Sequence, residues 1–322
     1  MAFLEVKNLD KSFPIKGGVF QRTVSSVKAV SGVSFSLNKG ETLGIVGESG
    51  CGKTTLGRTL VRLYEPSAGD IQFDGKDLVK ASKSALKEIR KDFQMIFQDP
   101  FASLNPRMSV RAIIEEPLKL NKIGDQQERQ EKIDKIIKLV GLRPDALNRY
   151  PHEFSGGQRQ RIGIARSLIL NPKLIIADEP VSALDVSIQS QILNLLVELQ
   201  KKLGLTYIFI THDLAVVKYI SDKIAIMYLG KIVEFGSVDD IFNKTKHPYT
   251  KALLASILVP DPAKRGHSEA LGGDVPSPAN PPSGCVFHTR CKFAMEVCKN
   301  KIPEMKSVAG SNSHQSACFL ND

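Results

Sequence analysis

The sequence predicts an α/β protein in which a largely parallel sheet carries an inserted helical subdomain and a small C-terminal extension. The first observation is that short apolar runs typical of buried strands alternate with helical patterns along much of the chain. The second is a glycine-rich loop that joins one such strand directly to a helix. The third is that strand signals vanish between residues 99 and 170, where amphipathic helical patterns replace them.

The N-terminal part is predicted to form an antiparallel β subdomain, because its apolar segments are short and bounded by turn residues. Between the first two segments, Pro14–Ser26 contains two adjacent glycines and is predicted to be an exposed loop. A basic helix is expected to end near Arg90. The strands predicted here are Phe3–Leu9, Val27–Leu37, Thr42–Val46, Gly69–Gly75 and Met95–Phe97.

The glycine-rich loop matches the pattern Gly-x-x-x-x-Gly-Lys-Ser/Thr at every fixed position. Its residues are Gly47, Glu48, Ser49, Gly50, Cys51, Gly52, Lys53 and Thr54, and Thr55 follows. Glycines let backbone N–H groups approach an anion closely, and the helix predicted over Thr55–Leu63 points its positive end at the same place. Lys53 is expected to reach the β- and γ-phosphates of a nucleotide, and Thr54 or Thr55 to offer Mg²⁺ a hydroxyl. A glycine-rich surface turn is disfavoured by the strand and helix on either side. The fold class is therefore a phosphate-loop (RecA-like) core.

Two consecutive carboxylates supply the parts needed for hydrolysis. The apolar strand Leu174–Ala177 delivers Asp178 to the carboxyl end of the sheet, where it can order the Mg²⁺ shell. Glu179 follows directly and can polarise a water towards the γ-phosphate. An Asp-Glu pair at a strand end is by itself more often a turn or a helix cap. The phosphate loop upstream favours an ATPase.

Composition and charge limit where the chain works. There are 44 Lys and Arg against 34 Asp and Glu, which gives a net charge of +10, and 42% of residues are hydrophobic. This basic balance suits nucleotides, anionic lipid headgroups or nucleic acid without choosing among them. No apolar run approaches the roughly 18 residues of a membrane span, and the N-terminus lacks a signal-peptide pattern. The sequence therefore predicts a chain that stays in the cytosol.

The run Phe154–Arg161 resembles the signature motif of ATP-binding-cassette (ABC) ATPases. Its Ser155, Gly156 and Gly157 open a helix predicted over Gln158–Leu170, so that backbone N–H groups again face an anion. An ordinary Ser N-cap explains Ser155 but not the whole octad. The resemblance implies that Ser155 to Gln158 bind the γ-phosphate of ATP held by an opposite subunit, and that two cassettes sandwich two nucleotides head to tail.

Four further residues resemble cassette motifs by position, and the resemblance covers roughly residues 3 to 250. Gln98 resembles the Q-loop glutamine, which touches Mg²⁺ and the attacking water, and Asp185 ends the D-loop that crosses the dimer interface. His212 resembles the switch histidine that contacts the γ-phosphate, and Phe13 the aromatic that stacks on adenine. Taken singly they have other readings: a surface glutamine, a helix N-cap, a turn residue and a core aromatic.

The C-terminal tail holds four of the five cysteines, behind the Pro-rich segment Pro260–Gly284, which is predicted to be a stiff linker. In a reducing compartment such clustering indicates metal binding before disulfides. Four thiolates can hold Zn²⁺ or a four-iron four-sulfur cluster, and unligated thiols are the less favoured reading. Cys51 is expected to be no metal ligand, because it belongs to the phosphate loop. The tail cysteines are Cys285, Cys291, Cys298 and Cys318.

The tail is similar to the C-terminal extension of the oligopeptide/dipeptide importer ATPases, and the chain resembles the second ATPase of their pair. The resemblance is carried by His247–Thr250, Val275–Pro278 and Pro281–Cys291. It implies a 4Fe–4S cluster on the four cysteines, and a peripheral place on the cytoplasmic face of the cell membrane. It also implies three kinds of partner: a second ABC ATPase subunit in a heterodimer, two transmembrane permease subunits and an extracellular substrate-binding protein.

These features predict an ATP hydrolase that couples ATP binding and hydrolysis to the uptake of di- and oligopeptides. Importers of nickel or other small solutes share the tail and stay open as alternatives. A soluble ABC ATPase acting on nucleic acid or ribosomes is disfavoured, because two cassettes in one chain or a long coiled-coil insertion are missing; no direct nucleic-acid partner is expected. An ATP-gated regulatory or scaffold subunit is disfavoured by the intact catalytic motifs. The predicted domains are a core (1–98 and 171–240), a helical signature subdomain (99–170) and the extension (241–322).

Overall fold

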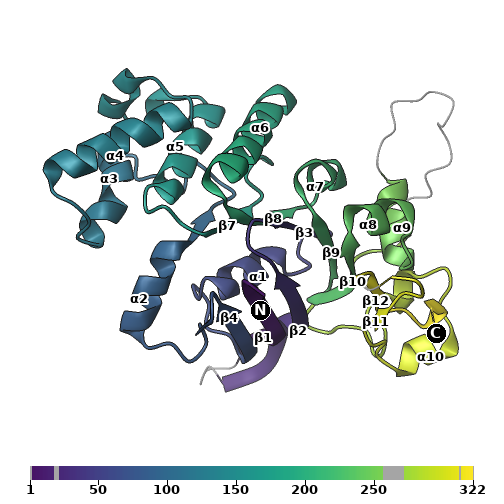
Figure 1. Ribbon diagram of the computed structural model, residues 1–322. Helices are drawn as coiled ribbons and strands as arrows, with labels where there is room; N and C mark the ends of the chain where they lie inside the picture. The colour runs from purple at the N-terminus through teal and green to yellow at the C-terminus, as the bar shows by residue number, and fades with distance from the viewer. Residues whose placement is uncertain (1, 18–21, 257–271, 312, 322) are drawn as a thin grey trace, which may run out of the picture. The chain divides into compact units, whose positions relative to one another are not determined.

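The computed structural model describes residues 2–17, 22–256, 272–311 and 313–321 (Figure 1). Its described residues form two compact units. The first comprises Met1–Lys80 with Ile210–Asp322, and the second is Ala81–Phe209. None of the described helices is both long enough and apolar enough to cross a membrane.

The N-terminal sheet of the first unit is antiparallel, as predicted, with the strand order β2-β1-β4-β5. Its two long strands pair as far as Gly17 opposite Arg22, so the predicted loop Pro14–Ser26 is wrong on both sides of the undescribed residues 18–21. A solvated antiparallel ribbon has the same polar composition as a loop, and β-branched residues around Val24 support the strand. The strands are β1 (Leu4–Gly17), β2 (Arg22–Leu37), β4 (Ala68–Phe73) and β5 (Lys76–Asp77).

The second sheet region of the first unit has the order β11-β12-β10-β9-β3. Every residue of β3 is buried, and β3 pairs in parallel with β9. Strands β9 and β10 form an antiparallel hairpin around Gly230, whose φ is 79°. The extension adds to this sheet, because β12 pairs with the free side of β10 and β11 pairs with β12. The strands are β3 (Thr42–Val46), β9 (Lys223–Tyr228), β10 (Lys231–Ser237), β11 (Lys306–Ser307) and β12 (Gln315–Ser316).

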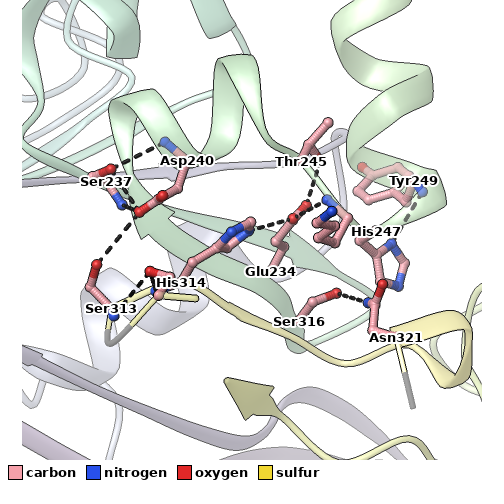
Figure 2. A network of polar contacts seen from close by, with 12 residues as sticks. Glu234, Ser237, Asp240, Thr245, His247, Tyr249, Ser313, His314, Ser316 and Asn321 are labelled. Carbon is pink, nitrogen blue, oxygen red and sulfur yellow. Dashed lines mark hydrogen bonds and ion pairs between the residues drawn. The ribbon is translucent and has the colours of Figure 1, made fainter. Parts of the chain in front are cut away.

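A buried polar network fastens the extension to β10 (Figure 2). The Glu234 carboxylate is fully buried and lies 2.8 Å from the ring nitrogen Nε2 of His314, which is 1% exposed. The hydroxyl of Thr245 and the N–H of Lys246 also donate to this carboxylate, at 2.8 and 2.6 Å. Since a buried carboxylate is costly unless its oxygens are satisfied, these donors make the docking of the extension specific.

Replacing His314 by Ala is expected to lower the free energy of unfolding by about 2–3 kcal/mol, because Glu234 then loses a donor inside the protein. Urea unfolding of the purified chain measures the loss, and hydrogen exchange at β12 locates it. The matched control is Glu296→Ala, which removes the exposed pair with Lys299 and should leave stability essentially unchanged. An equal loss in both variants would contradict the role given to the network.

Aromatic rings fill the core between β9, the helix α9 and the segment around Phe287. The rings of Tyr228 and Tyr249 lie 4.7 Å apart, and each lies 5.3 Å from the ring of Phe287. These contacts join all three segments in one hydrophobic cluster. The helices of this unit are α1 (Lys53–Leu60), α7 (Leu214–Ile220), α8 (Val238–Asn243), α9 (Pro248–Ala255) and α10 (Glu296–Asn300), with the 3₁₀ turns η4 (His288–Arg290) and η5 (Phe319–Asn321).

The second unit contains the parallel pair β6 and β7, which is in register from Phe93 opposite Leu174 to Ile96 opposite Ala177. All of β7 is buried, as expected for a central parallel strand with a continuous apolar run. Strand β8 is the next neighbour of β7, and it begins in this unit. The strands are β6 (Phe93–Ile96), β7 (Leu174–Asp178) and β8 (Thr206–Thr211).

The segment 99–170 is helical, as the loss of strand signals predicts, and α3, α4 and α5 lie together in Figure 1. The helix α5 begins at Gly156 and ends at Leu168, two residues earlier at each end than the predicted Gln158–Leu170. Part of the predicted linker, residues 260–271, lies outside the described residues. The helices of this unit are α2 (Lys83–Asp92), α3 (Val110–Leu120), α4 (Gln126–Leu139), α5 (Gly156–Leu168) and α6 (Val186–Leu203), with the 3₁₀ turns η1 (Pro144–Asn148) and η2 (Pro151–Glu153).

Candidate functional site

The predicted phosphate loop lies in the first unit, between β3 and α1. Two of its glycines are required by close backbone neighbours. A Cβ on Gly47 would lie 2.1 Å from the carbonyl oxygen of Met227, and one on Gly52 would lie 2.0 Å from that of Ala29. Gly52 also has φ 104°, in the region that favours glycine, and it caps α1. The loop is therefore held tightly against β2 and β9.

Lys53 is 4% exposed and folds back over the loop that precedes it. Its ammonium donates to the carbonyl oxygens of Gly47 at 2.7 Å and Glu48 at 3.0 Å. Thr54 and Thr55 follow in the first turn of α1, partly exposed. A loop of backbone N–H groups, a buried ammonium and two hydroxyls at a helix N-terminus fits the phosphates of a nucleotide with Mg²⁺.

Cys51 lies inside the loop, where burial raises the pKa of its thiol. Its carbonyl oxygen accepts a hydrogen bond of 2.8 Å from the N–H of Gly230 in the β9–β10 turn. The tail cysteines line a different cavity, which Cys51 does not reach. Its place in the structure is that of a packed loop residue.

His212 and Phe13 also belong to the first unit. His212 is exposed directly after β8, and Asp213 next to it caps α7 by accepting from the N–H of Ala215 at 2.7 Å. Phe13 is half-buried on β1, with its ring edge-to-face against Tyr64 at 5.3 Å and the Lys11 ammonium 4.8 Å from the ring centre. Phe13 is thus no core residue. Tyr64 is an aromatic neighbour that no sequence motif indicates.

The predicted hydrolysis residues lie in the second unit, at the carboxyl ends of the neighbouring strands β6 and β7. Asp178 is fully buried at the last position of β7. Glu179 follows with φ 45°, a conformation that a non-glycine residue seldom adopts. Gln98 Nε2 donates to Glu179 Oε2 at 3.2 Å. Two residues 81 positions apart in the sequence are therefore in contact.

The signature segment forms a capped helix start. The Ser155 hydroxyl accepts from the N–H of Gln158 at 3.4 Å, and the Gln158 side chain accepts from the N–H of Ser155 at 3.1 Å. A Cβ on Gly157 would lie 2.4 Å from Ile188 Cγ2, so this glycine permits close packing on α6. Asp185 is exposed at the N-cap position of α6, yet its side chain accepts no hydrogen bond from the first turn of that helix, all of which is described.

The four tail cysteines line one cavity of about 20 Å³, together with residues that include His247, Phe287 and His288. All four are free thiols, and burial raises the pKa of Cys285 to about 11 and also raises those of Cys291 and Cys318. Within the described ranges, however, no three or more His, Cys, Asp or Glu side chains stand in an arrangement that could hold a metal ion. The structure therefore does not support the expected iron–sulfur or zinc site, although the four cysteines line one cavity.

Known proteins share both parts of the chain. A family model described as ABC transporter matches residues 30–182, and one described as oligopeptide/dipeptide transporter, C-terminal region, matches residues 233–298. The oligopeptide transport ATP-binding protein AppF of Bacillus subtilis is 58% identical, covering 98% of this chain and 97% of its own. The oligopeptide transport ATP-binding protein OppF of Haemophilus influenzae is 57% identical, covering 98% of this chain and 96% of its own.

Solved cassettes also resemble this chain. The structure of cbiO1 from Clostridium perfringens, part of an ABC transporter complex, has a TM-score of 0.65 at 30% identity, covering 75% of this chain and 90% of its own. The ATP-binding cassette MJ0796, in a dimeric post-hydrolysis state bound to ADP and Pi, has a TM-score of 0.65 at 29% identity, covering 73% and 98%. The chain belongs to the ATP-binding proteins of ABC transporters, in the oligopeptide/dipeptide transporter family, and is an ATP hydrolase.

Proposed function

We propose that this chain is an ATPase subunit of an importer for di- and oligopeptides. The observation that carries the proposal is the contact between Gln98 and Glu179 in a chain that also holds a complete phosphate loop. The extension and the peptide-transport relatives support the substrate class. The peptide would pass through membrane permeases, so no residue of this chain needs to contact it.

The residues suggest a division of labour on ATP. Lys53 would leave the carbonyl oxygens of its own loop for the phosphates, and Glu179 would take a proton from the attacking water, which Gln98 and His212 help to orient. Thr54, Gln98 and Asp178 are the proposed contacts of Mg²⁺, which when bound neutralises charge that develops on the phosphates. Phe13 is proposed to stack on adenine, because part of its ring is exposed.

A second cassette would complete the site. Ser155 to Gln158 form the start of a helix, where Ser155, Gly156 and Gln158 are exposed and Gly157 is buried. Such an exposed helix start fits the phosphate of ATP bound to another subunit. Asp185 would lie at the same interface. We propose a non-identical cassette as the partner, two permeases above the pair on the cytoplasmic face of the membrane, and an extracellular binding protein. The proposal also assigns residues 1–98 and 171–240 to the ATP-binding core, 99–170 to the helical signature subdomain and 241–322 to the extension.

The finer proposal is that the four tail cysteines hold a thiolate-ligated group. Cys285, Cys291, Cys298 and Cys318 share one cavity, and soft thiolates suit an iron–sulfur cluster or Zn²⁺. Burial raises the pKa of Cys285, Cys291 and Cys318, so these three thiols keep their protons until a cation displaces them. The bound group would brace a short segment of chain that has little secondary structure of its own.

Anaerobic purification is expected to yield a protein that absorbs near 400 nm and contains about four irons, as Cys₄ ligation of such a cluster requires. Replacing Cys285 and Cys298 by Ser should abolish this absorption and the iron, because both line the cavity. Cys51→Ser is the matched control and should leave the iron content unchanged. A colourless wild-type protein that contains one zinc would show that the cysteines hold zinc and no cluster. A wild-type protein that contains neither iron nor zinc would refute both forms of the proposal.

The substrate class is tested by reconstitution with the proposed permeases and binding protein. Vesicles that contain the whole transporter should transport labelled tri- to pentapeptides when MgATP is present on the side of the membrane where the ATPase subunits lie. Nickel and small opine-like solutes are the competing cargoes. ATP-driven uptake of one of these without peptide uptake would overturn the peptide assignment and leave the importer assignment standing.

A further inference from the structure

One residue of the phosphate loop is held through its backbone and its side chain at once. The Glu48 N–H donates to the hydroxyl oxygen of Tyr249 at 3.0 Å, and the Glu48 carbonyl oxygen accepts from Lys53. The Glu48 carboxylate accepts two hydrogen bonds from the Arg290 guanidinium, at 2.7 and 3.1 Å. Tyr249 and Arg290 both belong to the region after the ATPase core, and lie 201 and 242 positions from Glu48.

Arg290 is placed to act as a rigid clamp. Its side chain is only 5% exposed, and the fork geometry of guanidinium matches a carboxylate with two parallel bonds. A second hydrogen bond from the same nitrogen reaches the Tyr228 hydroxyl at 3.4 Å. The hydrogen bonds to Glu48, and to a lesser extent the one to Tyr228, raise the pKa of Arg290 above its ordinary value. The guanidinium therefore stays charged, and its partner Glu48 belongs to the phosphate loop.

The short turn η4 carries Arg290, and two of the tail cysteines border that turn. The N–H of His288 donates to the carbonyl oxygen of Cys285 at 3.0 Å, and the N–H of Arg290 donates to that of Phe287 at 3.0 Å. Cys291 follows directly. Whatever orders the cysteine cavity thus also orders the turn that presents the guanidinium to Glu48.

We propose that the C-terminal extension is a working part of the ATP site: Arg290 and Tyr249 are positioning residues that hold the phosphate loop in its anion-binding form. A loop with three glycines loses much conformational freedom when it closes on phosphate. Holding Glu48 by its N–H and its carboxylate meets part of that cost before ATP arrives. The inference rests on the nucleotide site and not on the identity of the imported solute.

The test is a double-mutant cycle on ATP affinity with the full-length chain. Arg290→Ala should weaken binding of a fluorescent ATP analogue with Mg²⁺ about tenfold, and Arg290→Lys should recover only part of it. In a Glu48→Ala background, Arg290→Ala should cause no further loss, because the clamp then has nothing to hold. Lys299→Ala, on the exposed face of the same extension, should bind like the wild type.

If Arg290 and Tyr249 only stabilise the fold, the expected results differ. The thermal midpoint without nucleotide and the iron or zinc content are measured for every variant. A lower midpoint with unchanged ATP affinity would overturn the proposal, as would losses that simply add in the double variant. Should Arg290→Ala fail to fold, Tyr249→Phe decides alone: it deletes one hydroxyl, and wild-type affinity in that variant refutes the clamp. A wild-type chain that binds no ATP at all would instead refute the ATPase function.

Discussion

Replacing Glu179 by Gln is expected to lower the ATP turnover number by about 100-fold or more while ATP binding persists. The amide keeps the size of the carboxylate and can still accept from Gln98 Nε2, so the local geometry should survive. It cannot take the proton of the attacking water. Turnover is measured as phosphate release, and binding as retention of a fluorescent ATP analogue. The trapped state should also accumulate the cassette dimer, which light scattering detects.

The matched control is Glu131→Gln, an exposed carboxylate on α4 of the same unit. It should hydrolyse ATP at the wild-type rate. Near-normal hydrolysis by Glu179→Gln would refute the role given to Glu179 as the base. Loss of binding together with hydrolysis would show instead that the φ 45° conformation of Glu179 supports the fold of its strand end.

Local spacing predicts the parts of the site that one segment builds alone. The fixed glycines and Lys53 specify a loop, and in the structure a Cβ on Gly47 or Gly52 would approach backbone oxygens to 2.1 and 2.0 Å. Gln98 and Glu179 come from two such segments, and they meet because both follow buried strands and parallel strands end at one edge of the sheet. In each case a short pattern determines a backbone geometry, and the geometry determines the chemistry.

Tertiary packing decides what the sequence cannot show. Pro14–Ser26 has the composition of a loop, yet pairing across β1 and β2 makes most of it strand. The Arg290–Glu48 clamp joins residues 242 positions apart, and no sequence motif links the two residues. The cysteine clustering predicts a metal or iron–sulfur site, whereas the described residues bring the four cysteines to one cavity without a metal-holding arrangement. It does not predict side-chain directions, which depend on packing around η4.

Replacing Lys53 by Ala is expected to weaken binding of MgATP by about 10- to 100-fold, which corresponds to about 1.5–3 kcal/mol for hydrogen bonds between charged groups. The ammonium is almost fully buried and is positioned by the carbonyl oxygens of Gly47 and Glu48, so water cannot replace it at the same place. Isothermal titration with a slowly hydrolysed ATP analogue measures the loss. Lys7→Ala, which removes an ammonium with 61% of its side chain exposed, is the control and should leave affinity unchanged. Because the Lys53 ammonium also contacts Glu48, Lys53→Ala should reduce the coupling energy between Glu48 and Arg290. An undiminished coupling energy would mean that Arg290 and Lys53 act on the loop independently.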